Sequence, residues 1–159
     1  LMKLEAMGCE ITTGEDFITV SRTEPLRAVD IQTLPHPGFP TDLQAQFMLL
    51  ASLAEGPSVI TENVFENRFM FAAELSRMGA DITIEDHHAL VRGVELLQGA
   101  PVKATDLRAG AALVLAGIVA EGETRVSHIY HIDRGYEDYV GKLRGLGAEV
   151  SRLDVDESI

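Results

Sequence analysis

The sequence predicts an α/β fold of the α+β kind, built from repeats, with its helices at the centre and its sheets outside. First, residues 3–11, 74–82 and 142–150 match, each reading as a helix end, a glycine and the start of a strand. Second, two long segments are apolar on nearly every side, which is typical of buried helices. Third, the predicted strands alternate apolar and polar residues, which indicates sheets with one wet face.

Within each repeat the pattern predicts the order strand, helix, strand, helix, strand, strand. We expect two complete repeats and the tail of a third in one partial domain. Residues 1–22 form the tail, residues 23–95 the second repeat and residues 96–159 the third. Units of this kind close most naturally by pseudo-threefold packing. The sequence opens inside a helical pattern with no cap before it, so we expect a piece of a longer chain.

The first helix of each complete repeat is predicted at residues 41–56 and 105–122. Thr41 and Thr105 are the expected N-caps, and Gln44 completes a capping box in the earlier copy. Both helices should be buried on most sides, because polar residues are confined to their first turns.

The second helices are predicted near residues 69–78 and 135–146, each with one polar and one apolar face. A strand is predicted at residues 124–131, where Val126, His128 and Tyr130 alternate with Arg125, Ser127 and Ile129.

Composition narrows the function classes. A formal net charge of −12 argues against DNA, RNA or an anionic membrane as the main partner. Any anionic substrate must therefore be held by a local cluster of arginines. The longest uncharged apolar run, residues 109–120, is shorter than the roughly 20 residues of a bilayer span. Glycine fingerprints and phosphate-binding loops are absent, so we expect no cofactor. The single cysteine excludes an internal disulfide framework and fits a reducing cytosol.

Asp42 is the first candidate for catalysis. Two prolines and a glycine in "HPGFP", residues 36–40, stiffen the backbone directly before it. The ordinary alternative is an acid that stabilises the helix through its dipole, by about 0.3–1 kcal/mol. The repeated pair Thr105–Asp106 favours this structural role, whereas the proline-rich approach is particular to Asp42 and favours function.

Arg68, Arg108 and Arg134 are the second candidate group. Arg68 and Arg134 occupy equivalent places in the two repeats. Arg108 lies in the first turn of a buried helix, where the dipole disfavours a cation, so we expect an anion beside it, either Asp106 or a ligand. The alternative for Arg68 and Arg134 is a surface ion pair with an adjacent acid, Asp133 in the latter case. Three such arginines favour a carboxylate or phosphate site, because guanidinium groups bind both bidentately.

The remaining candidates are weaker. His128 and His131 fall in a predicted strand that points their rings to opposite faces, so we expect no metal site. His87 and His88 lie in a polar turn and should be solvated. Cys9 stands where the other repeats have alanine, which indicates a small packed position and not a nucleophile.

Four segments carry a resemblance to a known family. They are "HPGFPTDLQAQFMLLASLAEG", "TENVFENRFMFAAELSRMGA", "ATDLRAGAALVLAGIVAEG" and "IYHIDRGYEDYVGKLRGLGAEV". Over essentially the whole chain they resemble the C-terminal part of the UDP-N-acetylglucosamine 1-carboxyvinyltransferases, the enolpyruvyl transferases of the first committed step of peptidoglycan synthesis. The resemblance implies an inside-out α/β barrel of βαβαββ units, which agrees with the repeats.

The resemblance also implies roles for individual residues. Asp42 matches the acid that contacts the sugar 3-hydroxyl and is the proposed base, and Val64 matches a residue whose backbone contacts the nucleotide sugar. The residues that match those around the phosphoenolpyruvate pocket are Arg68, Asp106, Arg108 and Arg134. The implied substrates are UDP-N-acetylglucosamine and phosphoenolpyruvate, and the implied chemistry is addition followed by elimination of phosphate.

Part of the family's machinery has no match in this sequence. The family's general-acid cysteine and N-terminal lysine are absent, and Cys9 does not match the cysteine's loop. We therefore expect the chain alone to be inactive. We expect it to pair with the missing N-terminal half, or to self-associate through the face where a further unit should pack. A cytoplasmic location is implied as well.

Two alternatives remain open. The shikimate-pathway enolpyruvyl transferase (3-phosphoshikimate 1-carboxyvinyltransferase) shares fold and chemistry, but "FPTDLQAQ" and "ENVFENRFM" favour the nucleotide-sugar enzyme. The other is a non-catalytic ligand-binding or assembly module, which would be indifferent to Asp42→Asn and Arg134→Ala.

Overall fold

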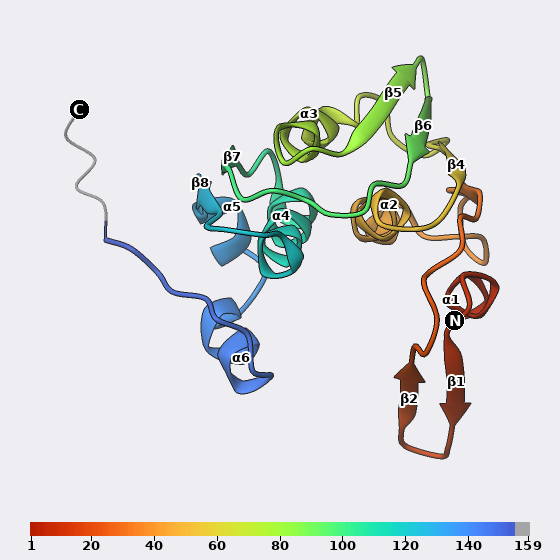
Figure 1. Cartoon of the computed structure of the whole chain (residues 1–159), viewed down its shortest axis with the longest axis horizontal. Coiled ribbons are helices and arrows are strands. Elements are labelled where there is room, and N and C mark those ends of the chain that lie inside the picture. Colours follow the sequence, from red (N-terminus) through yellow and green to blue (C-terminus); the bar gives the residue numbers. More distant parts are fainter. Residues whose placement is uncertain (155–159) are drawn as a thin grey trace.

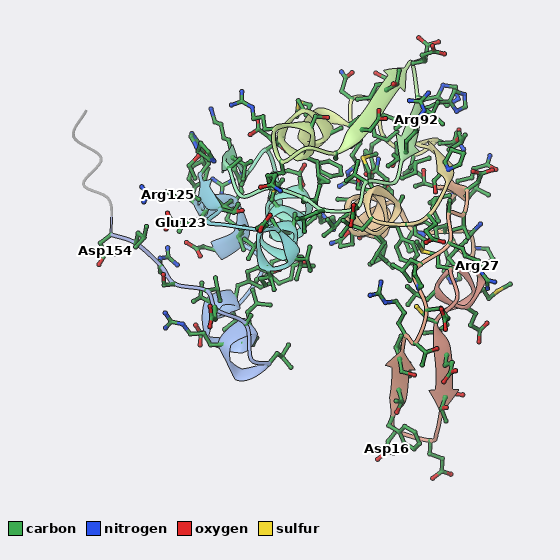
Figure 2. All side chains as sticks on the ribbon, in the orientation of Figure 1. Asp16, Arg27, Arg92, Glu123, Arg125 and Asp154 are labelled. Carbon is green, nitrogen blue, oxygen red and sulfur yellow. The ribbon has the colours of Figure 1, made fainter. Side chains whose placement is uncertain are left out.

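The computed structural model describes residues 1–154, which form both helices and strands (Figure 1). The N-terminal part holds helix α1 (Met2–Ala6) and an antiparallel hairpin of β1 (Glu10–Thr13) and β2 (Ile18–Ser21). The hairpin extends away from the other elements, and Asp16 lies in its turn (Figures 1 and 2).

The middle of the chain follows the predicted order strand, helix, strand, helix, strand, strand. Its elements are β3 (Ile31–Gln32), the 3-10 helix η1 (Thr41–Leu43), α2 (Gln44–Ser52), β4 (Pro57–Thr61), α3 (Met70–Arg77), β5 (Asp81–Glu85) and β6 (His88–Arg92). The four strands form one sheet in the order β3–β4–β6–β5. β3 and β4 are parallel, and the other neighbouring pairs are antiparallel.

This sheet has one buried and one wet face, as the alternation predicts. Ile60, Ala89 and Val91 are fully buried, whereas Val59 on the opposite face of β4 is 39% exposed. The buried face packs on α2, seven of whose nine residues are buried. Helices therefore lie inside and the sheet outside (Figure 1), which confirms the predicted layering.

The last part of the chain departs from the predicted order. It contains β7 (Pro101–Lys103), α4 (Leu107–Val119), β8 (Arg125–Ser127), α5 (Tyr130–Asp133) and α6 (Tyr139–Gly145). β7 and β8 are parallel and form a two-stranded sheet. Residues 146–154 form no strand, so the predicted final strands are not found in the described part of this repeat.

Two predictions in this region need correction at their boundaries. The helix expected near residues 135–146 is found as α6, but it starts only at Tyr139, because Asp138 is its N-cap, with a left-handed φ of 45° and a hydrogen bond accepted from Gly141 N at 3.1 Å. The strand expected at residues 124–131 ends at Ser127, because His128 has a φ of 58° and the chain then turns into α5.

The core is centred on the contact between α2 and α4, which lie side by side (Figure 1). Its fully buried side chains include Met48, Leu75, Val91 and Leu113. Burial on most sides, predicted for both helices, holds for α2. In α4 it holds only for the first half, since Val119 is 50% exposed.

No helix within residues 1–154 combines the length and the hydrophobicity needed to cross a bilayer. The same stretch contains no group of three or more His, Cys, Asp or Glu side chains placed to hold a metal ion.

Candidate active site

The segment that leads to Asp42 is fixed by its own backbone. Leu34 N donates to Phe39 O at 3.0 Å, and Gly38 N donates to Pro35 O at 2.8 Å. A Cβ on Gly38 would lie 2.4 Å from Leu34 Cβ, so only glycine fits there. Phe39 packs edge-to-face on Phe47 of α2, with ring centroids 4.9 Å apart. The segment directly before Asp42 is therefore anchored to the core.

Asp42 lies in η1 and does not cap a helix. Its side chain is 55% exposed, and Oδ1 forms ion pairs with Arg108 Nε at 2.7 Å and with Arg68 Nη1 at 3.9 Å. Pro40 is the N-cap residue of η1, and no side chain caps either η1 or α2. The predicted caps Thr41 and Gln44 are therefore wrong. The amide of Gln44 is instead buried, with no hydrogen-bond partner among residues 1–154.

Thr41 is engaged elsewhere, by a buried carboxylate that sequence reasoning missed. Glu62 is 3% exposed. Its Oε2 accepts from Thr41 Oγ1 at 2.9 Å, and its Oε1 accepts from Thr33 Oγ1 at 2.8 Å. Oε1 also accepts from the backbone N–H groups of Val64 and Phe65, at 2.9 and 3.2 Å. The only signal in the sequence was an acid directly after the alternating strand "SVIT".

Arg68 is held by the loop that comes after Glu62. Its Nη1 donates to Thr41 Oγ1 at 2.9 Å, and its guanidinium lies 4.6 Å from the centroid of the Phe65 ring. The side chain is only 19% exposed. The predicted alternative, a surface pair with an adjacent acid, is not what the structure shows, because Arg68 faces Asp42.

Arg108 reaches Asp42 from the start of α4. Asp106 caps this helix, since its Oδ1 accepts from the backbone N–H groups of Arg108 and Ala109 at 2.9 and 3.0 Å. Thr105 is therefore not the N-cap, which corrects the prediction. The anion expected beside the Arg108 guanidinium is Asp42 and not Asp106. Asp42 thus offsets the unfavourable position of a cation at a helix N-terminus.

Arg134 lies at the end of α5, with its guanidinium 5.7 Å from the Tyr130 ring centroid. It has no hydrogen bond or ion pair to Asp42, Arg68 or Arg108. Its neighbour Asp133 pairs with Arg152 at 2.6 Å, so the ion pair considered for Arg134 is not formed.

The ion pair between Asp133 and Arg152 shifts the pKa of both side chains. The hydrogen bond from Arg152 lowers the pKa of the Asp133 carboxyl, and the same bond raises the pKa of the Arg152 guanidinium.

The weaker candidates take different positions in the structure. His128 is in a left-handed turn and His131 is in α5, so the predicted strand geometry of the two rings is wrong. His87 and His88 are both exposed, as predicted. Cys9 is partly buried against the core, which agrees with a small packing position.

The structure thus brings together Asp42, Arg68 and Arg108, with Asp106 at the base of Arg108 and Val64 joined to them through Glu62. An accessible carboxylate between two guanidinium groups can accept a proton and lies beside cations that can hold an anion. Of the predicted site residues, Val64 reaches this group only through Glu62, and Arg134 forms no hydrogen bond or ion pair with Asp42, Arg68 or Arg108.

Comparisons with known proteins agree with this geometry. Residues 1–143 match the EPSP synthase (3-phosphoshikimate 1-carboxyvinyltransferase) family. The chain is 56% identical over 97% of its length to a UDP-N-acetylglucosamine 1-carboxyvinyltransferase of Psychrobacter sp.. It is 58% identical over 96% of its length to the enzyme of that name from Magnetococcus marinus. The chain spans 36% and 37% of these relatives.

Solved structures show the same fold. The enolpyruvyl transferase NikO from Streptomyces tendae superimposes with a TM-score of 0.85 at 37% identity, over 93% of this chain and 34% of NikO. EPSP synthase from Acinetobacter baumannii superimposes with a TM-score of 0.59 at 22% identity, over 84% of this chain and 34% of that one. The chain therefore belongs to the EPSP synthase (3-phosphoshikimate 1-carboxyvinyltransferase) family of enolpyruvyl transferases.

Proposed function

We propose that this chain supplies part of the active site of an enzyme that transfers the enolpyruvyl group of phosphoenolpyruvate to the 3-hydroxyl of UDP-N-acetylglucosamine. The observation that carries the proposal is Asp42, held between Arg108 at 2.7 Å and Arg68 at 3.9 Å and still 55% exposed. The names of relatives at 56% and 58% identity support the choice of substrate.

In the proposed reaction Asp42 accepts the proton of the sugar hydroxyl, and the oxygen attacks C2 of phosphoenolpyruvate while C3 gains a proton. The tetrahedral adduct then loses a proton from C3, the C2–C3 double bond re-forms, and the C2–O bond to phosphate breaks. Arg68, Arg108 and Arg134 hold the phosphate and carboxylate of phosphoenolpyruvate. We expect the donor for C3 in the part of the relatives that this chain does not span.

The remaining candidates have narrower roles. Asp106 fixes the start of α4 and thereby the backbone from which Arg108 extends. The N–H of Val64 already donates to Glu62, so a contact from its backbone to the nucleotide sugar would use its carbonyl oxygen.

The test needs the rest of the enzyme, so we propose a chimera in which this chain replaces the matching segment of the Psychrobacter relative. Phosphate release from phosphoenolpyruvate should require UDP-N-acetylglucosamine and should not occur with shikimate 3-phosphate. Turnover with shikimate 3-phosphate instead would point to the shikimate-pathway reaction. A chimera that keeps its turnover when Asp42 is changed to Asn would contradict a catalytic role and favour an assembly module.

The chain alone should release no phosphate above a buffer blank. It should associate with itself or with the complementary part of the enzyme, and a strictly monomeric, folded species in light scattering would count against this. We further propose a cytoplasmic location, which a fusion to a reporter would test.

A further inference from the structure

Glu62 is the one charged residue among residues 1–154 that is buried, and its bonds have a fixed direction. Arg68 can only donate, so its bond to Thr41 uses the threonine oxygen as acceptor. The proton of Thr41 is then directed to Glu62 Oε2. The carboxyl oxygens of Glu62 accept from four donors, namely the hydroxyls of Thr33 and Thr41 and the backbone N–H groups of Val64 and Phe65.

These bonds connect the segments that carry the site. Thr41 immediately precedes Asp42, and Val64 and Phe65 begin the loop that carries Arg68. Thr33 holds this loop as well, since its Oγ1 accepts from Asn63 N at 2.9 Å. One buried carboxylate therefore fixes both sides of the contact between Asp42 and Arg68.

The third repeat provides an internal control. Thr33 N donates to Thr61 O, and Ala104 N donates to Ser127 O in the same arrangement, so His128 stands where Glu62 stands. No carboxylate occupies this place, and the Thr105 hydroxyl is buried without a partner among the described residues. Asp106 there turns back to cap its own helix.

We propose that Glu62 is a positioning residue, which holds Thr41 and the loop at residues 63–68 so that Asp42 and Arg68 face one another and the substrate. The proposal rests on the function proposed for Asp42. It adds a residue that contacts no substrate and acts through Thr41. In the absence of Glu62, we expect the Thr-Asp pair to relax toward the arrangement of Thr105 and Asp106.

The test uses the chimera with Glu62→Gln, Thr41→Val and Thr41→Ser. Glutamine presents an NH₂ group to the Thr41 hydroxyl, and valine removes the hydroxyl while keeping the shape. Because small displacements of reacting groups are costly, kcat should fall about 10- to 100-fold in both, with much smaller changes in the KM of either substrate. Thr41→Ser keeps the hydroxyl and should restore most of the turnover.

Glu74→Gln is the matched control. Glu74 also accepts a backbone N–H, that of Lys103 at 2.9 Å, but it lies on α3 and has no bond to Thr41 or Arg68. The kcat of the chimera that carries Glu74→Gln should stay unchanged. If Glu62→Gln fails to fold, the Thr41→Val and Thr41→Ser pair decides the question alone, because Thr41 is partly exposed.

The outcomes separate the two proposals. An inactive chimera, or one indifferent to Asp42→Asn, overturns the proposed function and this inference with it. Loss of turnover in Asp42→Asn together with full turnover in Glu62→Gln or Thr41→Val overturns the inference alone. Equal losses in Thr41→Val and Thr41→Ser also overturn it, because a hydroxyl would then not be the group that matters.

Discussion

The dipeptide Thr-Asp occurs at the start of the first helix in two repeats and behaves differently in each. At residues 105–106 the aspartate caps α4 and the threonine hydroxyl is buried without a partner in the described chain. At residues 41–42 the threonine is bound by Glu62 and the aspartate faces two arginines. The same pair of residues therefore makes different contacts in the two places, and at residues 41–42 its threonine binds Glu62, which directly follows β4.

The largest expected effect concerns Asp42. Asp42→Asn keeps the shape of the side chain and removes its ability to take a proton, so kcat of the chimera should fall by about 10²- to 10⁴-fold. Thermal melting should change little, because the side chain is more than half exposed. Steady-state phosphate release measures kcat, and circular dichroism measures the melting temperature. Asp81→Asn, on the outer sheet, is the control and should leave kcat unchanged.

A second test compares the equivalent positions Gly110 in α4 and Gln46 in α2. A Cβ on Gly110 would lie 2.9 Å from both Ala104 Cβ and Ile132 Cγ1. Gly110→Ala should therefore destabilise the chain by about 1–3 kcal/mol through overpacking. Urea unfolding followed by circular dichroism measures it. Gln46→Ala should cost less, and an unchanged stability in Gly110→Ala would contradict the close packing of Ile132 of α5 on α4.

A third test compares how much Asp106 and Asp42 each contribute to the free energy of unfolding. Asp106→Ala removes two hydrogen bonds to the first turn of α4 and should cost about 0.5–2 kcal/mol. Asp42→Ala removes no cap and should cost less. The same urea titration measures both. Asp106→Asn should retain most of the stability, since asparagine caps as well as aspartate.

The smallest effect concerns Tyr139, which joins α6 to α4 by donating its hydroxyl to Ala111 O at 3.1 Å. Burial raises the pKa of Tyr139 to about 12. The folded state therefore retains this proton above the ordinary pKa of about 10, and this contribution to stability is complete below that pH. It is lost as pH rises from about 10 to about 12.

Unfolding midpoints across that pH range should fall less steeply in Tyr139→Phe than in the unmodified chain. The variant itself should lose about 0.5–1.5 kcal/mol at neutral pH, the usual net value of one hydrogen bond. An unchanged slope in Tyr139→Phe would show that another group controls stability in alkali.

The local parts of the fold were predictable from the sequence. The order of elements from β3 to β6 follows from periodicity, and a glycine with a φ of 99°, 95° or 93° follows the helix in all three matching segments, at Gly8, Gly79 and Gly147. The short helix α5 was not predicted, because the alternating pattern favours a strand to residue 131, whereas the chain leaves the strand at Ser127 and His128 takes a φ of 58°. The boundaries proposed for the repeats stay a prediction.

The sequence identified most residues of the site, but it did not predict which of them contact one another. Asp42 and Arg108 were both candidates, yet their pairing joins residues far apart in the sequence. The cap predicted at Thr41 failed because its hydroxyl bonds to Glu62, 21 residues away. Local patterns identify which side chains can do chemistry, whereas long-range contacts decide which of them meet.

The three-residue helix η1 makes the length of the segment between Pro40 and Gln44 critical. In a 3-10 helix each residue turns the chain by about a third of a revolution. One inserted or deleted residue would therefore point the carboxylate of Asp42 away from both guanidinium groups, even if every side chain were kept. Natural variation here should consist of replacements and not of changes in length, whereas the hairpin turn near Asp16, remote from the site, should tolerate insertions.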